Sequence, residues 1–271
     1  MRVAIVGGGS IARLLLQHIR AGQMSHTEVV ALAGRSEASR GQLLASEFGV
    51  PFVVGVDALL ARRPEAVVEA ASHEAVRAFG PAALSAGVAL IVLSGGALAD
   101  DALRETLERA ARQHGALLYV PSGGIGGLDA LKAACLAGVH EVTIAVTKPP
   151  GAWKGIAYVE RLGVDLDRLS VPLTLYDGPA RIGIPHLPAN VNIAAVLSLA
   201  GIGLDRTRLK AVADPGLVYN THYIDVRGET GNISIKLENV PSAENPKTAL
   251  LACYSALAAI NTLQARVRYG T

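Results

Sequence analysis

The first half of the chain alternates short, almost wholly apolar runs with longer stretches in which apolar residues recur at every third or fourth position. The short runs have the character of buried strands, and the longer stretches have the period of amphipathic helices. Strands without an exposed polar face are typical of a parallel sheet that helices cover on both sides. The predicted strands are 3–6, 28–33, 52–54, 66–70, 88–93 and 116–120, and the clearest helices are 10–20, 72–84 and 100–114.

From Val139 onward the pattern changes, because polar and apolar residues now alternate as they do in strands with one exposed face. The segments 219–226 and 231–237 flank a short turn at 227–230, which predicts a hairpin. With two further strands, 141–147 and 173–176, this part of the chain is expected to form an antiparallel sheet.

The end of the chain returns to a helical period. Asn245 and Pro246 suit the N-cap and the first position of this last helix, which we expect to pack on the first sheet. The predicted fold class is therefore α/β, with an N-terminal Rossmann-type parallel sheet, an inserted α+β domain and a C-terminal helix that returns to the first domain. The expected domains are 1–120 plus 241–271, and 121–240.

Composition narrows the function classes. The 271 residues carry a formal net charge of +2, which is too small to favour a nucleic-acid partner, and no run reaches the ~18 apolar residues of a membrane span. Cys135 and Cys253 lie in apolar helical surroundings, which predicts buried thiols in a cytoplasmic protein rather than a disulfide or a nucleophile. No cluster has metal-ligand spacing, so a metal-free site is expected.

The first predicted strand runs directly into three glycines and a helix. Gly7, Gly9 and Ala12 occupy the small-residue positions of the dinucleotide fingerprint G-x-G-x-x-G/A. Gly7 permits a tight turn and Gly9 lets the backbone approach a pyrophosphate, whose charge suits the free N–H groups of Ser10 and Ile11. Glycine turns also join strands to helices for structural reasons alone, but the strand-turn-helix setting favours cofactor binding.

The second predicted strand ends in Gly34, Arg35 and Ser36, where an NAD site usually places an acidic residue on the ribose hydroxyls. The guanidinium of Arg35 suits a 2′-phosphate instead, and Arg40 follows about a turn farther along. We therefore predict NADP or NAD as the cofactor. The alternative is that Arg35 lies on the adenine or points into solvent.

Two later loops are candidates for ligand contact. The loop 122–128, with Gly124 among its four glycines, precedes a predicted helix and can present N–H groups to an anion. It can equally be a hinge between domains that needs unusual φ values, and the two interpretations are compatible. Lys148 begins a proline-stiffened loop, which is either a flap that supplies cations to an acidic substrate or an ordinary surface loop.

Asparagines and histidines supply the remaining candidates. Asn190 and Asn192 open a predicted helix, either as caps or as ligands for the nicotinamide or ribose. His222 alternates with Asn220 on one strand face, where a histidine is either structural or the group that moves the proton accompanying hydride transfer. His73, after the fourth strand, either caps a helix or lies near the nicotinamide.

Taken in order, these motifs resemble the L-aspartate dehydrogenase family. The opening glycine motif is generic, whereas the later motifs are specific and extend the resemblance over essentially the whole chain. They are the segments 121–129 (PSGGIGGLD), 147–153 (TKPPGAW), 188–192 (PANVN), 214–215 (DP), 220–222 (NTH) and 244–248 (ENPKT).

The resemblance implies a two-domain, NAD(P)-dependent oxidoreductase, commonly a homodimer. Its reaction interconverts L-aspartate and iminoaspartate, which hydrolyses to oxaloacetate and ammonia or feeds NAD biosynthesis. The resemblance assigns His222 as the active-site histidine, and Gly124 and Asn190 as cofactor-binding positions, although the family often has alanine at the position of Gly124. His222 would be the general base, lining an open cleft and titrating near the histidine reference of ~6.5.

The two carboxylates of an aspartate substrate require donors. Lys148, Asn192 and Asn220 are the candidate substrate-binding residues, together with the glycine-loop amides and His186. Two alternatives stay open at this point. One is a reductase of the dihydrodipicolinate reductase or homoserine dehydrogenase type, and the other is a nucleotide-sensing protein without turnover.

Overall fold

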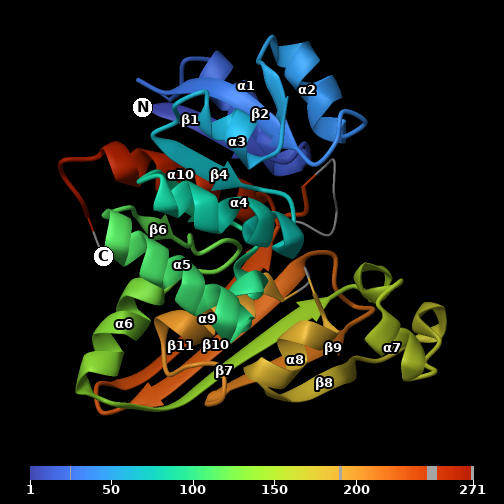
Figure 1. Ribbon diagram of the computed structural model, residues 1–271. Coiled ribbons are helices and arrows are strands. Elements are labelled where there is room, and N and C mark those ends of the chain that lie inside the picture. Colours follow the sequence, from blue (N-terminus) through green and yellow to red (C-terminus); the bar gives the residue numbers. More distant parts are fainter. Residues whose placement is uncertain (25, 189–190, 243–248, 270–271) are drawn as a thin grey trace. The chain divides into compact units, whose positions relative to one another are not determined.

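The computed structural model describes residues 1–24, 26–188, 191–242 and 249–269 (Figure 1). The chain divides into two compact units, residues 1–123 with 252–269, and residues 124–251. The sequence predicted a domain boundary at 240/241, whereas the described residues 241–242 and 249–251 group with 124–240 in this division. The Leu250 N–H donates to the Val240 carbonyl (2.9 Å), and Pro241 forms a β-bridge with Ala249.

The first unit is built on a six-stranded sheet in which every neighbouring pair is parallel, as the apolar runs predicted. The strand order is β3-β2-β1-β4-β5-β6, so the chain leaves β1 to one side and returns to it from the other. The carboxyl edge between β1 and β4 is therefore the topological switch point, where α/β sheets bind ligands. The strands are β1 (Arg2–Val6), β2 (Glu28–Gly34), β3 (Phe52–Val54), β4 (Ala66–Glu69), β5 (Ala89–Val92) and β6 (Leu118–Tyr119).

Helices cover both faces of this sheet (Figure 1). The C-terminal helix α10 buries Ala256 and Ile260 in one core with Ile5 of β1 and Leu15 of α1, which confirms that the helix returns to the first sheet. On the opposite face, Gly80 of α4 lies against Leu107 of α5 and Leu90 of β5. The helices are α1 (Ser10–Arg20), α2 (Arg40–Phe48), α3 (Val56–Leu60), α4 (His73–Ser85), η1 (Gly95–Ala99), α5 (Asp101–His114) and α10 (Leu250–Gln264).

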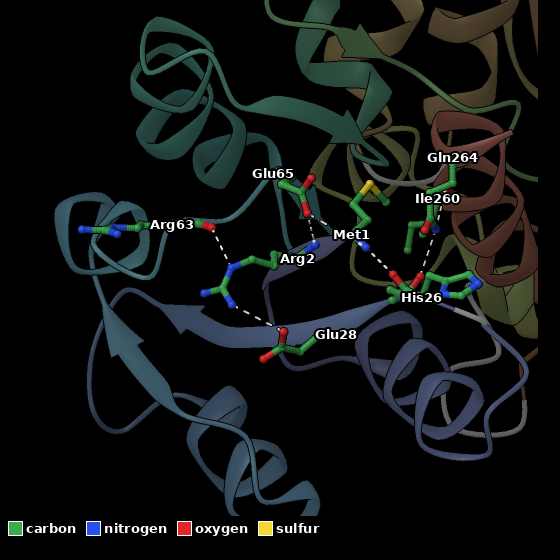
Figure 2. A network of polar contacts seen from close by, with 9 residues as sticks. Met1, Arg2, His26, Glu28, Arg63, Glu65, Ile260 and Gln264 are labelled. Carbon is green, nitrogen blue, oxygen red and sulfur yellow. Dashed lines mark hydrogen bonds and ion pairs between the residues drawn. The ribbon is translucent and has the colours of Figure 1, made fainter. Parts of the chain in front are cut away.

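Contacts around Arg2 anchor the amino end of β1 (Figure 2). The Arg2 N–H donates to Glu65 (2.6 Å), and its guanidinium donates to the Arg63 carbonyl (3.1 Å) and to Glu28 (3.4 Å). The Arg2–Glu28 pair is largely exposed and is therefore worth little energy. The hydrogen bonds from the guanidinium to the carbonyls of Arg63 and Arg62 instead tie the start of β1 to the segment that precedes β4.

The second unit contains a five-stranded sheet of order β11-β10-β7-β9-β8. The predicted hairpin is present, since β10 and β11 pair antiparallel around a turn. The sheet is nevertheless mixed rather than antiparallel, because the unpredicted strand β9 lies parallel to β7. The strands are β7 (Val139–Lys148), β8 (Leu173–Pro179), β9 (Thr207–Ala213), β10 (Asn220–Gly228) and β11 (Gly231–Asn239).

One face of this sheet is buried under helices, and the other carries exposed residues such as Tyr223 and Asp225. On the covered side, Gly127 lies against Ile235 of β11, and Gly183 lies against Leu209 of β9. The helices of this unit are α6 (Leu128–Ala137), η2 (Pro150–Trp153), α7 (Ala157–Arg161), η3 (Leu166–Arg168), α8 (Ala180–His186) and α9 (Asn192–Ala200).

The structure also bears on the predictions for the two cysteines and for membrane-spanning segments. Cys253 is buried as predicted, but Cys135 is only partly buried, because the face of α6 that carries it is incompletely covered. In the described parts of the chain, no helix is both long and apolar enough to cross a bilayer. Asn245 and Pro246, expected to start the last helix, lie outside the described residues.

Candidate active site

The glycine turn between β1 and α1 is held by close backbone packing. Gly7 has φ +119°, and a Cβ on it would lie 2.6 Å from the Ala70 carbonyl oxygen. A Cβ on Gly8 would lie 2.3 Å from the backbone nitrogen of Gly41. Both glycines are therefore required by the neighbouring loop and helix, independently of any ligand.

Gly9 differs from its two neighbours, because a Cβ there would meet nothing within 4 Å. Gly9 is the N-cap of α1, makes no side-chain cap bond, and is followed by a first turn without acidic residues. The N–H groups of Ser10 and Ile11 thus begin a helix whose N-cap residue has no side chain to occupy them, which is an arrangement that accepts an anion. These residues fit a dinucleotide pyrophosphate.

Arg35 is exposed and directly follows β2, at the same carboxyl edge of the sheet. The pKa of Glu74 in α4 is lowered chiefly by a hydrogen bond from Ser72, and the charge of Arg35 adds to this effect. The Arg35 guanidinium therefore acts on the start of α4, close to the switch point. Its placement is compatible with contact to a 2′-phosphate.

Glu69, the last residue of β4, is a polar residue of this edge that the sequence analysis missed. Its side chain is fully buried, and it accepts hydrogen bonds from Ala71, Ser72 and Ser94. Burial raises the pKa of the Glu69 carboxyl, and the hydrogen bonds oppose that rise. The available signal was one acidic residue inside the otherwise apolar run 66–70.

In the second unit, three polar side chains gather on the covered face of the sheet. His222 of β10 is opposite Val146 of β7, which puts Lys148 and Asn220 on the same face as His222. All three are buried, with His222 only 3% and Lys148 only 4% exposed. The predicted alternation of Asn220 and His222 is thus correct, but His222 does not line an open cleft.

Lys148 is the last residue of β7 and does not belong to a flap. Its ammonium lies 5.6 Å from the ring centroid of Trp153, which is fully buried and donates from Nε1 to the Val212 carbonyl (3.1 Å). The proline-rich turn of η2 therefore places an aromatic ring against the lysine. This fixes the cation on the covered face, where a cation–π contact is stronger than in water.

His222 has an unusual electrostatic environment. The pKa of His222 is lowered to about 3, first by burial and then by the charge of Lys148. This corrects the expected titration near ~6.5, which assumed an open cleft. Its buried Nδ1 has no hydrogen-bond partner within the described structure. His222 is therefore a neutral imidazole whose Nδ1 has an unused capacity for hydrogen bonding.

The glycine loop of the second unit packs beside this polar face. The Gly124 carbonyl accepts a hydrogen bond from Asn239 (2.9 Å), and a Cβ on Gly124 would lie 3.3 Å from Ala249 Cβ. Gly123 and Gly127 have positive φ values, +64° and +77°, as the hinge interpretation requires. The glycines thus have a conformational reason to be present, and their N–H groups can still meet a ligand.

The other candidates are placed as follows. Asn192 is the first residue of α9, next to the N-cap Val191, while Asn190 lies outside the described residues. His73 does not cap α4, because Ser72 is the N-cap and its side chain accepts from the Ala75 N–H. His186 ends α8 and stacks on Tyr158, with 4.8 Å between ring centroids.

Comparisons with known proteins identify the family of this chain. Residues 129–263 match the family model for the C-terminal part of aspartate dehydrogenase, and residues 7–121 match the NAD binding domain of homoserine dehydrogenase. The L-aspartate dehydrogenase of Methanosarcina acetivorans is 42% identical over 272 residues, which cover 100% of both chains. The chain belongs to the L-aspartate dehydrogenase family.

Other members of the family are similar over the same length. The L-aspartate dehydrogenase 2 of Bordetella pertussis is 41% identical and covers 99% of each chain. The crystal structure of aspartate dehydrogenase from Thermotoga maritima superposes with a TM-score of 0.74 at 27% identity, covering 100% of this chain and 99% of that one. A hyperthermophilic archaeal homoserine dehydrogenase, at 13% identity and a TM-score of 0.63, shares the fold alone.

The low pKa of His222 predicts a pH-dependent stability. The neutral form is favoured in the folded state, so the stability is complete above the unfolded pKa of ~6.5 and is lost as the pH falls toward 3. Between pH 7 and pH 5, the wild type should lose about 2 kcal/mol of unfolding free energy relative to a His222→Gln variant. Urea unfolding at both pH values measures this difference, because all other titrating groups are common to the two proteins. Equal losses would contradict the buried, neutral histidine.

Proposed function

We propose that this chain catalyses the NAD(P)-dependent oxidative deamination of L-aspartate to iminoaspartate, and the reverse reaction. The single observation that carries the proposal is the buried pair of Lys148 and His222 on one sheet face, in a chain that belongs to the L-aspartate dehydrogenase family. A cation beside a neutral imidazole suits a substrate that carries both an acidic group and an amine that must lose a proton. Iminoaspartate then hydrolyses to oxaloacetate and ammonia, or serves NAD biosynthesis.

We further propose that the first unit holds the dinucleotide and that the second provides substrate binding and dimerisation. The Gly7–Gly9 turn, with Ser10 and Ile11, would hold the pyrophosphate, and Arg35 would meet a 2′-phosphate. Gly124 and Asn190 are the proposed contacts from the rest of the chain. A bound nicotinamide would supply the acceptor for the hydride that leaves the substrate Cα. The family resemblance supports a homodimer, and the two free cysteines favour a cytoplasmic location.

The protein's own residues would bind the substrate and move its proton. Lys148 would pair with a substrate carboxylate in a charge-assisted contact, with Asn220 and Asn192 donating to the remaining oxygens. The Nδ1 of His222 would accept the proton that leaves the amine, or the proton of the water that attacks the imine. Burial is the larger cause of the low His222 pKa and the Lys148 charge the smaller, so pairing Lys148 with a carboxylate would remove the smaller cause and strengthen the base.

The first test is turnover. The wild type should reduce NAD or NADP with L-aspartate and should oxidise NADH or NADPH with oxaloacetate plus ammonia. His222→Gln, which nearly preserves the buried volume, should lower kcat by ~10²–10⁴-fold and leave cofactor affinity unchanged. His140→Gln is the matched control, because His140 is an exposed histidine of the neighbouring strand β7. Robust turnover with L-homoserine or malate, and none with L-aspartate, would contradict the proposal.

The second test concerns substrate charge. Lys148→Met keeps the length of the side chain but removes its charge, so KM for L-aspartate should rise by about 10- to 150-fold, the worth of one charged hydrogen bond. Lys154→Met is the control, since Lys154 lies six residues along the chain, half exposed and paired with Asp167. Steady-state kinetics give both values. An unchanged KM in Lys148→Met would place the carboxylate elsewhere.

The third test concerns the cofactor phosphate. Arg35→Asp replaces a phosphate partner with a group that repels phosphate, and should shift preference from NADP toward NAD by ~2–4 kcal/mol. The affinity of the same variant for NAD is the internal control, because NAD lacks the 2′-phosphate. Binding titrations with both dinucleotides measure the shift. Unchanged relative affinities would show that Arg35 faces away from the ribose.

A further inference from the structure

Glu69 is a buried carboxylate whose hydrogen bonds join two loops at the carboxyl edge of the first sheet. Oε1 accepts from the backbone N–H groups of Ala71 (2.8 Å) and Ser72 (2.9 Å) and from the Ser94 hydroxyl (2.9 Å), and Oε2 accepts from the Ser94 N–H (3.0 Å). Ala71 and Ser72 belong to the connection between β4 and α4, whereas Ser94 follows β5 and is the N-cap of η1. One side chain therefore holds both loops.

A carboxyl group in this position is expensive to bury, and an apolar residue would fill the same volume without that penalty. Burial raises the pKa of Glu69, but its partners lower it again, the Ala71 N–H first among them. Three of the four donors are backbone N–H groups that no strand or helix pairing would otherwise satisfy. The gain from Glu69 is thus a defined loop conformation at this edge, rather than core packing.

The loop that Glu69 holds is in direct contact with the glycine turn. A Cβ on Gly7 would lie 2.6 Å from the Ala70 carbonyl oxygen and 3.1 Å from Ala71 Cβ. No side chain fits between the two segments, so a displacement of Ala70 or Ala71 must be transmitted to Gly7. Gly7 in turn leads into Gly9 and the first N–H groups of α1.

We propose that Glu69 is a positioning residue of the dinucleotide site, which fixes the β4–α4 loop so that the glycine turn is already shaped for the pyrophosphate. This inference rests on the cofactor binding in the proposed function, but not on the identity of the substrate. Glu69 acts through Ala70 and Gly7 and needs no contact with the dinucleotide. Its effect should therefore be the same for the oxidised and the reduced cofactor, which share the pyrophosphate.

The test is direct binding of oxidised and reduced cofactor, measured by calorimetry without aspartate and well below the unfolding temperature. In Glu69→Gln, an amide NH₂ must replace one acceptor oxygen and meet an N–H donor, so Kd should rise about tenfold for both redox forms. Ser94→Ala removes only the hydroxyl donor and should raise Kd about threefold. Leu107→Ala is the control, since this buried leucine packs against Gly80 and should lower Tm without changing Kd.

The outcomes separate the two proposals. A wild type that binds neither redox form would overturn the proposed function and this inference with it. A wild type that binds the cofactor, with unchanged Kd in folded Glu69→Gln and Ser94→Ala, would overturn the role of Glu69 alone. A loss confined to the oxidised form would also overturn it, because that would indicate a charge effect on the nicotinamide. If Glu69→Gln does not fold, the Kd of Ser94→Ala decides.

Discussion

Burial of ionisable side chains at the ends of strands is the constraint on which this structure depends. Glu69 ends β4 and Lys148 ends β7, and each is almost wholly removed from water. An ionisable group in such a place destabilises the fold unless neighbours provide hydrogen bonds or compensating charge. Around each of these strand ends, the chain adopts a local conformation that supplies such neighbours.

The two strand ends meet the demand in different ways. Glu69 is satisfied by donors from two loops, so it rigidifies the edge beside the glycine turn. Lys148 lies against the Trp153 ring and depresses the pKa of His222, whose Nδ1 is left without a partner in the described part of the chain. A buried group whose hydrogen bonds are all made fixes the conformation of the loops around it. A buried nitrogen without a partner can still form a hydrogen bond with a ligand.

The fold was largely predictable because its signals are local. The apolar run ending at Gly7 predicts a buried strand, and strict alternation placed Asn220 and His222 on one face. Strand β9 was missed although its buried positions also alternate, because the buried residues are interrupted by the charged Arg208 and Lys210. Period-2 alternation also cannot distinguish a parallel neighbour from an antiparallel one, which is why the mixed sheet was not expected.

The candidate site was only partly predictable, for a physical reason. The sequence identifies His222 as a residue able to accept a proton, but its proton affinity depends on burial and on Lys148, which is distant in the chain. Glu69 was missed for the same reason, since its role depends on donors in two separate loops. The residue types in a sequence show which groups can accept a proton or bind an ion. The electrostatic environment of each group, in contrast, is a property of the folded chain.

The coupling between Lys148 and His222 bears on substrate choice under the proposed function. Burial, and after it the charge of Lys148, lowers the pKa of His222, so His222 holds a proton weakly in the free protein. A substrate with a second carboxylate brings a negative charge to Lys148 and so removes one of the two causes of the low pKa. With the side-chain carboxylate as the partner of Lys148, an amino acid with an apolar side chain would leave that charge in place. Discrimination would then operate on the strength of the base as well as on binding, which would suppress turnover of amino acids that enter the site without an acidic side chain.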